Sequence, residues 1–296
     1  MAAVPGWSRR ALFVLATSEG FERAVRAVPG GAAIAWRLAS RYVAGPSSED
    51  ALGRVRGLSE HGLASSIDFF GENVTDAGEA DRVVDEYVRL AGRLATQGPP
   101  GTYLSVDLSH IGLDGPADAV ARRLERIAAA LPGGARVQVG AEQEARTDRI
   151  LAAVLTVARA GGPVSATVQA NLRRSIRDVE TLAEAGVPVR LVKGAYVERP
   201  EAALAWGDPT DVAFAELAYA LARAGASFSL ATHDPVLREA LLPAMPSVEV
   251  EMLLGVRPDD QASLVARGIP VRIYVAFGGE WFRYAMRRWA ESRGDR

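Results

Sequence analysis

Eight short apolar segments, each followed by a charged amphipathic stretch, limit the possible folds of this chain more than any other feature. Strands that are buried on both faces of a parallel sheet are continuously apolar, and helices connect them. Eight such units in series favour a closed α/β barrel, the (β/α)8 or TIM barrel, over an open sheet. The expected strands are 64–69, 103–108, 136–140, 164–168, 189–193, 228–231, 248–251 and 271–275, and the expected helices include 76–95, 117–130, 145–159, 176–184 and 211–224.

The segment before the first expected strand is predicted to be helical and to pack on the barrel. The chain then divides into residues 1–62 and one catalytic barrel domain, 63–296. Turn-forming residues interrupt the first segment at 29–31 and at 45–46, and Ser47 followed by Asp50 is a typical helix start. No glycine-rich dinucleotide motif follows the first strand, and no phosphate-loop motif occurs, so neither nucleotide-binding fold has support.

Charge and composition exclude several classes of function. Lys and Arg number 34, Asp and Glu number 36, and the net charge of −2 provides no basic field for nucleic acid. The absence of cysteine excludes disulfides, thiolate nucleophiles and cysteine-ligated metals. No stretch approaches the ~20 apolar residues of a membrane span. Ser8 to Arg10 and the apolar run after them fit an amphipathic helix better than a twin-arginine signal, so a cytoplasmic protein is expected.

Polar residues gather where the expected strands end, which is the face that carries the chemistry of such barrels. A simpler interpretation of any one of them is that strand ends are polar because they meet solvent. Taken together they predict a polar site on one rim of the barrel. These residues are Asp68, Glu72, Asp107, His110, Glu142, Gln169, Lys193, Tyr196, His233, Asp234, Glu251 and Tyr274.

Two groups of cations make this interpretation stronger. Arg190 and Lys193 lie three residues apart on the fifth expected strand, the second of them at the strand end and next to Gly194. A lysine beside backbone N–H groups exposed by glycine suits a phosphate or an anionic cofactor. Near the C-terminus Arg287 and Arg288 are adjacent, and guanidinium groups suit carboxylates. For this second pair a solvated helix end, with cations favoured by the helix dipole, is an equally good explanation.

Five segments in order resemble the proline dehydrogenase family, across Arg41 to the C-terminus. They are 63–76, 190–198, 230–234, 249–255, and 272–278 with Glu280, Trp281, Tyr284, Arg287, Arg288 and Glu291. The resemblance implies a distorted barrel whose last helix lies over the barrel mouth, and FAD bound without a Rossmann motif. It implies oxidation of L-proline to 1-pyrroline-5-carboxylate by hydride transfer to flavin N5. It is also compatible with a quinone as electron acceptor and with peripheral association at the inner face of a membrane.

The resemblance assigns roles to individual residues, and no metal is among them. Arg190, Tyr274 and Asp107 are the expected catalytic residues. The expected cofactor-binding residues are Gln169, Arg190, Lys193, Gly194, Thr232, His233, Glu251 and Glu291. The substrate carboxylate is expected to meet Arg287 and Arg288, and the substrate ring Tyr196, Tyr274, Tyr284 and Leu253. An arginine pair and aromatic walls would hold the reacting carbon over the flavin and exclude water, while the cofactor performs the redox chemistry.

Several positions depart from the family pattern. Asp107 stands where a lysine is usual, Gly140 where an aspartate is usual, Glu251 for a glutamine and Asn171 for a tyrosine. A lysine-to-aspartate change alters the charge by two in a partly desolvated pocket, where each charge matters by kilocalories. Asp107 would pair with Arg287 or Arg288, or would bind an extra cationic group of the substrate. We hypothesise that the substrate is a proline-like cyclic or linear amino acid or amine.

Three alternatives stay open at this point. A catalytically degenerate homologue would bind flavin or an amino acid without turnover. Lys193 on a barrel strand could form the Schiff base of an aldolase. A metal-dependent barrel would use Asp107, Glu142 and His233, although three histidines in the whole chain leave few ligands.

Overall fold

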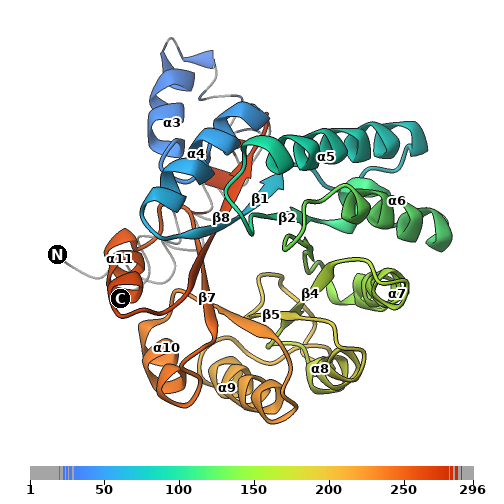
Figure 1. The fold of residues 1–296 in the computed structure, drawn as a ribbon, viewed down its shortest axis with the longest axis vertical. Helices are drawn as coiled ribbons and strands as arrows, with labels where there is room; N and C mark the ends of the chain where they lie inside the picture. Colours follow the sequence, from blue (N-terminus) through green and yellow to red (C-terminus); the bar gives the residue numbers. More distant parts are fainter. Residues whose placement is uncertain are drawn as a thin grey trace.

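The computed structural model describes residues 20, 23, 25, 27, 28, 30–279, 281, 282, 284, 285 and 288. Its centre is a closed barrel in which eight parallel strands follow one another in chain order (Figure 1). The strands are β1 (Ala64–Phe69), β2 (Tyr103–Val106), β3 (Val137–Val139), β4 (Val164–Gln169), β5 (Val189–Val192), β6 (Phe228–Ala231), β7 (Glu249–Leu253) and β8 (Val271–Phe277). The barrel closes where β1 pairs with β8, from Ala64 opposite Arg272 to Phe69 opposite Phe277.

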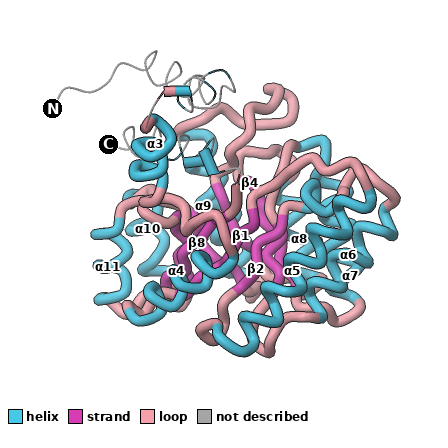
Figure 2. Tube along the Cα trace, turned by 90° about the horizontal axis from the view of Figure 1, so that it is seen from above, coloured by secondary structure: helices cyan, strands magenta, loops and turns pink. Residues whose placement is uncertain are grey.

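Helices surround the barrel on the outside, as Figures 1 and 2 show. Those after β1 are α5 (Ala77–Gln97), α6 (Ala117–Ala129), α7 (Thr147–Arg159), α8 (Ser175–Glu184), α9 (Asp208–Arg223), α10 (Pro235–Leu241) and α11 (Pro258–Ala266). Short 3-10 helices cover Leu108–Ile111, Glu144–Arg146 and Leu242–Ala244. The longest helix, α5, buries one face that includes Val84, Tyr87 and Leu94, as the amphipathic pattern requires. Among the described residues, no helix combines the length and apolarity needed to cross a membrane.

Two further helices precede the barrel, α3 (Gly31–Ala39) and α4 (Ser48–Glu60). A capping box starts α4, since the Ser47 hydroxyl accepts from the Asp50 amide while the Asp50 carboxylate accepts from the Ser47 amide. Ala51, Leu52 and Val55 bury the inner face of α4 in the main core. α3 belongs to a second, smaller apolar cluster, in which the rings of Trp36 and Trp281 meet edge to face at 5.0 Å.

The barrel predicted from the alternation of apolar and amphipathic segments is confirmed, and strands 64–69 and 228–231 agree with β1 and β6. β2 is shorter than predicted because the chain turns into a 3-10 helix at Leu108, which ends at Gly112 with a left-handed φ of 82°. α9 begins three residues earlier than predicted, at Asp208, with a proline in its first turn. β8 continues to Phe277, two residues beyond its predicted end.

The inside of the barrel differs from its outside in chemistry. Apolar side chains fill the space between strands and helices, whereas polar and charged side chains point into the lumen. At the amino end of the strands, Arg272 lies 2.8 Å from the Glu249 carboxylate and donates to the carbonyls of Ser65 and Gly101. Its guanidinium also covers the Tyr103 ring, 3.5 Å from the centroid. This arginine therefore ties β1, β7 and β8 to the segment that leads into β2.

We predict that Arg272→Ala lowers the free energy of unfolding by about 3 kcal/mol, because it leaves Glu249 without its partner in a largely dry lumen. Urea unfolding followed by circular dichroism measures the change. The control is Arg267→Ala, which breaks the exposed pair with Glu239 and is expected to cost at most about 1 kcal/mol. Equal losses for the two variants would contradict the structural role of Arg272.

Candidate active site

Glu251 on β7 is the centre of the polar network in the barrel lumen. Its carboxylate accepts hydrogen bonds from Gln138 Nε2 on β3 at 2.8 Å and from the Ser229 hydroxyl on β6 at 2.6 Å. Arg190 on β5 completes the set, with Nε at 2.8 Å from Oε2 of Glu251. Glu251 is 3% exposed, so this buried negative charge is compensated by one cation and two neutral donors.

Arg190 is held between Glu251 and an aromatic ring. Its guanidinium carbon lies 5.5 Å from the centroid of the Tyr274 ring on β8, within the range of a cation–π contact. The arginine side chain is 14% exposed. A rigid strand, an ion pair and a ring thus fix a cation in the barrel lumen.

Asp68 on β1 lies beside this cation. It is hydrogen-bonded to Tyr274 and to Ser105. Burial raises the pKa of Asp68 to about 6, and these two hydrogen bonds and the charge of Arg190 oppose the rise. Burial also raises the pKa of Tyr274 well above its ordinary value, and the charges of Asp68 and Asp107 add to this effect. Tyr274 therefore stays a hydrogen-bond donor at neutral pH.

Asp107, directly after β2, and Gly140, directly after β3, are in close contact. A Cβ atom added at Gly140 would overlap Oδ1 of Asp107, so the carboxylate occupies the space that any larger residue at 140 would need. Burial raises the pKa of Asp107 well above its ordinary value, and the charges of Asp68, Glu142 and Glu72 raise it further. The ion pairs found among the described residues do not include Asp107, although the charge of Arg190 opposes the rise of its pKa.

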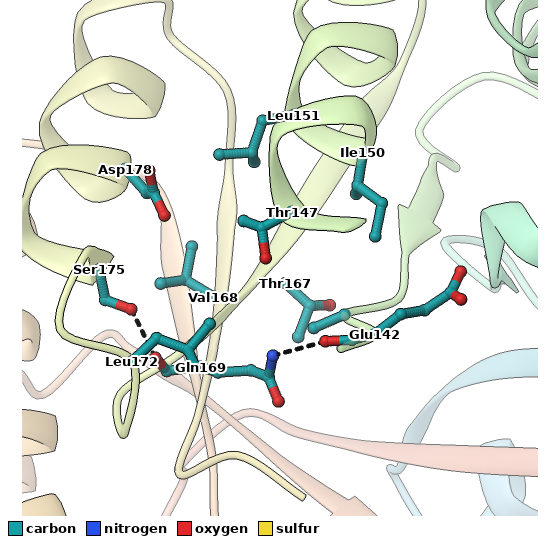
Figure 3. Close-up of a pocket in the computed structure, with 11 residues that line it drawn as sticks. Glu142, Thr147, Ile150, Leu151, Thr167, Val168, Gln169, Leu172, Ser175 and Asp178 are labelled. Atoms are coloured by element: carbon teal, nitrogen blue, oxygen red, sulfur yellow. Dashed lines mark hydrogen bonds between the residues drawn. The ribbon is translucent and has the colours of Figure 1, made fainter. Parts of the chain in front are cut away.

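Gln169, at the end of β4, is oriented by its neighbours (Figure 3). Its side-chain amide donates to the backbone carbonyl of Glu142 at 2.8 Å, and its backbone carbonyl accepts from the Ser175 hydroxyl at 2.5 Å. The Glu142 carboxylate accepts from the Ser109 amide at 2.9 Å and from Arg146 at 2.6 Å. The Gln169 carboxamide is consequently a rigid group with a defined donor end.

Lys193, just after β5, is held by two carboxylates. Its ammonium lies 2.6 Å from Asp211 and 2.8 Å from Asp234. Burial alone would lower the pKa of Lys193, but the hydrogen bonds to Asp211 and Asp234 outweigh it and the pKa is raised. A Schiff-base lysine needs a lowered pKa to be a free amine, so the aldolase alternative loses its support.

Gly194 follows Lys193 with a φ of 115°, a conformation that side chains rarely adopt. A Cβ atom there would also overlap the Asn171 carboxamide, whose buried Oδ1 has no hydrogen-bond partner. The backbone at Gly194 is thus bare and lies close to an unsatisfied acceptor. Such a place suits close approach by a ligand that offers donors as well as oxygen atoms.

His233 follows β6 and is a neutral acceptor. Its Nε2 accepts from the Leu253 amide at 2.9 Å. Burial lowers the pKa of His233 to about 3, and the charge of Arg288 acts in the same direction. The preceding Thr232 hydroxyl accepts from the amide of Asp234, and Asp234 caps α10.

No group of three side chains suited to bind a metal ion occurs among the described residues, so the metal-dependent alternative is not supported there.

An aromatic wall borders the site. The Tyr284 ring packs on Phe70, just after β1, with centroids 4.9 Å apart, and the Arg288 guanidinium carbon lies 5.3 Å from the Tyr284 centroid. Leu253 packs in the same apolar cluster as Tyr284. Tyr196 is half-buried in the segment between β5 and α9. Arg287 and Glu291 lie outside the described residues.

Four residues of this network had no role assigned from the sequence: Asp68, Ser105, Gln138 and Ser229. Asp68 was recognised as a polar strand end, but its bond to Tyr274 was not. Ser105 and Gln138 each lie two residues before a position singled out at a strand end, Asp107 and Gly140. Since alternate residues of a strand share a face, stepping back by two from each rim position would have found both of them.

His110, expected at the polar rim, is buried instead against aromatic rings. Its ring lies 5.2 Å from that of Phe69 and 6.2 Å from that of Tyr87, between centroids. Burial lowers the pKa of His110 to about 4, although a hydrogen bond with the backbone of Phe69 acts against this. The residue is therefore a neutral packing element beneath the site.

Comparison with known proteins identifies the family of this chain. The family model described as proline dehydrogenase matches residues 51–295. The chain belongs to the proline dehydrogenase family. It is 31% identical over 264 residues to proline dehydrogenase 1 of Bacillus subtilis (strain 168), covering 86% of each chain. It is 32% identical over 274 residues to proline dehydrogenase of Deinococcus radiodurans, covering 87% of each.

Solved structures show the same fold at lower identity. Proline utilization A of Bdellovibrio bacteriovorus, inactivated by N-propargylglycine, matches 97% of this chain with a TM-score of 0.79 and 21% identity. Proline utilization A of Corynebacterium freiburgense matches 99% with a TM-score of 0.71 and 17% identity. The chain spans about a third of the length of these two proteins, 36% and 34% respectively.

We predict that Gly140→Ala lowers the free energy of unfolding by about 2 kcal/mol, because the added methyl group displaces the Asp107 carboxylate in a packed lumen. In the background of Asp107→Ala the same substitution should cost less than about 1 kcal/mol. Urea unfolding of the wild type, both single variants and the double variant gives the coupling. An identical penalty in both backgrounds would show that the two residues do not share this space.

A second prediction concerns His110 and acid. Its folded-state pKa of about 4 is below the ordinary 6.5, so protonation favours the unfolded chain. The stability that neutral His110 provides is present above pH 6.5 and is lost as the pH falls towards 4. Between pH 7 and pH 5 the wild type should lose about 2 kcal/mol more than His110→Gln, at about 1.4 kcal/mol per pH unit. Parallel urea-unfolding profiles of the two proteins would refute this.

Proposed function

We propose that this protein is an FAD-dependent dehydrogenase that oxidises the CH–NH group of proline or a proline-like amino acid. The observation that carries the proposal is the placement of Arg190, which Glu251 and Tyr274 hold in the barrel lumen. A fixed cation there would stabilise negative charge on a reduced flavin ring. Membership of the proline dehydrogenase family supports this chemistry and substrate class.

The residues around Gly194 fit an anionic dinucleotide. Lys193 offers an ammonium group and Gly194 bare backbone to a phosphate, and the unsatisfied buried carbonyl of Asn171 can accept from a ribityl hydroxyl. We assign Lys193, Gly194, Thr232 and His233 to the ribityl and phosphate groups of FAD. Because Lys193 is paired with Asp211 and Asp234, a phosphate would have to share or replace these carboxylates. When bound, the flavin supplies the hydride acceptor.

Gln169 and Arg190 are assigned to the ring of the cofactor. The Gln169 carboxamide is fixed by Glu142, so it can face the pyrimidine side without losing rotational freedom on binding. Glu251 acts on the cofactor through Arg190, whose position it determines. Glu291 is assigned to the cofactor on the family resemblance alone.

The substrate side is assigned to the aromatic wall and the basic end of the chain. Arg288, with Arg287, would hold the carboxylate, and Tyr274, Tyr284, Tyr196 and Leu253 would exclude water from the reacting carbon. The partners we expect are a small amino acid or amine and an electron acceptor such as a quinone. A cytoplasmic protein could pass electrons to a quinone through peripheral contact with a membrane.

The direct test is the visible spectrum of the FAD-loaded protein before and after anaerobic addition of L-proline and a panel of proline-like amino acids. The proposal predicts stoichiometric FAD and loss of the oxidised-flavin band with at least one of these compounds. Bound flavin that none of them reduces would instead indicate a degenerate homologue. A protein that binds no FAD would overturn the proposal altogether.

A variant of Arg190 separates binding from chemistry. Arg190→Lys keeps a positive charge near Glu251 but loses the planar contact with Tyr274 and the fixed position. We expect retained flavin and a rate of flavin reduction that is lower by roughly a hundredfold, the usual cost of one oriented charge-stabilising group. Arg267→Lys on the exposed surface is the matched control and should change neither. An unaltered reduction rate in Arg190→Lys would remove Arg190 from the catalytic role.

A further inference from the structure

Asp107 is a carboxylate without a counter-ion among the described residues. Two arginines of this part of the barrel pair with other carboxylates, Arg190 with Glu251 and Arg146 with Glu142 and Asp114. Three carboxylates act on it, Asp68, Glu142 and Glu72, against one cation, Arg190. A desolvated carboxylate in such surroundings is costly until a cation or a donor reaches it.

The position of Asp107 is defined by packing. Its Oδ1 lies where a Cβ atom at position 140 would stand, and Gly140 is tied to β2 through its amide, which donates to the carbonyl of Val106 at 3.0 Å. Strands β2 and β3 thus fix the Asp107 carboxylate at the carboxyl end of the strands. Only glycine at position 140 leaves room for this carboxylate. Asp107 and Gly140, two departures from the family pattern, therefore form one structural unit.

A second, independent observation also points to a missing donor. Gln138 is 2% exposed and lies two residues before Gly140 on the same inward face of β3. Its Nε2 donates to Glu251, which fixes the orientation of the amide, because a flipped amide would place an oxygen against a carboxylate. Its Oε1 is left in the lumen without a hydrogen-bond partner. On this side of the lumen Gln138 therefore presents an acceptor that no described donor satisfies.

We propose that the substrate carries a second basic nitrogen, in addition to the amine that is oxidised, and that Asp107 binds this second ammonium group. The inference rests on the proposed function and narrows its substrate class from proline-like amino acids to diamino compounds. An ammonium ion supplies up to three donors and a positive charge, so it can satisfy a carboxylate and a neutral acceptor together. A neutral donor such as a hydroxyl group would satisfy the hydrogen bond but not the charge.

The experiment uses the FAD-loaded protein and three probes: L-proline, 4-hydroxy-L-proline and 4-amino-L-proline, the last two in both epimers. Anaerobic flavin reduction is followed at a series of concentrations for the wild type and for Asp107→Asn, which keeps the shape and removes the charge. We expect the wild type to prefer an aminoproline epimer over proline by roughly ten- to a hundredfold in kcat/KM, as one charged hydrogen bond provides. The preference should disappear in Asp107→Asn.

Two further variants serve as controls for this interpretation. Asp118→Asn, which removes an exposed carboxylate on α6, should keep the wild-type preference. The double variant Asp107→Lys with Gly140→Asp puts a cation at position 107, removes the net negative charge of the site and should prefer proline over aminoproline. This variant tests the effect of charge at position 107 on substrate preference even if Asp107→Asn does not fold.

The outcomes are distinct. Reduction by proline with no preference for an aminoproline epimer, or a preference that survives in Asp107→Asn, overturns the inference and leaves the proposed function standing. A preference for hydroxyproline equal to that for aminoproline also overturns it, because the charge would then be irrelevant. Flavin that no probe and no member of the wider panel reduces overturns the proposed function, and the inference fails with it.

Discussion

The buried carboxylate of Glu251 is the interaction on which the rest of the site depends. It joins β7 to β3, β5 and β6 through Gln138, Arg190 and Ser229. Most barrels of this class fill the lumen with branched apolar side chains, whereas this lumen is held by charges and hydrogen bonds. Removing one partner of such a network leaves an uncompensated charge, so each member constrains the others. The result is a cation, Arg190, whose position is set by the barrel itself.

The same arrangement explains the electrostatic character of the barrel mouth. On one side Lys193 and Arg190 are fixed by acidic partners, and His233 is kept neutral by burial and by neighbouring arginines. On the other side Asp68 and Asp107 are acids with raised pKa values. A redox cofactor with phosphates suits the first side, and a substrate that brings positive charge suits the second. The two halves meet at Tyr274, which is hydrogen-bonded to Asp68 and covered by Arg190.

The periodicity of the sequence was sufficient to predict the barrel, because continuous apolar strands alternating with amphipathic helices leave few other folds. It was also sufficient to place the polar rim, since strand ends could be recognised. The overlap between Gly140 and Asp107 could not be predicted, because it depends on how two adjacent strands are staggered. The burial of His110 could not be predicted either, because a 3-10 turn directs this polar residue against Phe69 and Tyr87. The roles of Gln138 and Ser229 required knowledge of which strands face each other across the lumen.

The central claim is that Arg190, held by Glu251, stands at the reactive edge of a bound flavin. A crystal structure of the FAD-loaded protein tests it most directly. The account predicts the isoalloxazine ring at the carboxyl end of the barrel, within hydrogen-bonding distance of the Arg190 guanidinium, with the Arg190–Glu251 contact preserved. A flavin bound elsewhere, or a ring in the mouth with Arg190 turned away from it, would contradict the account.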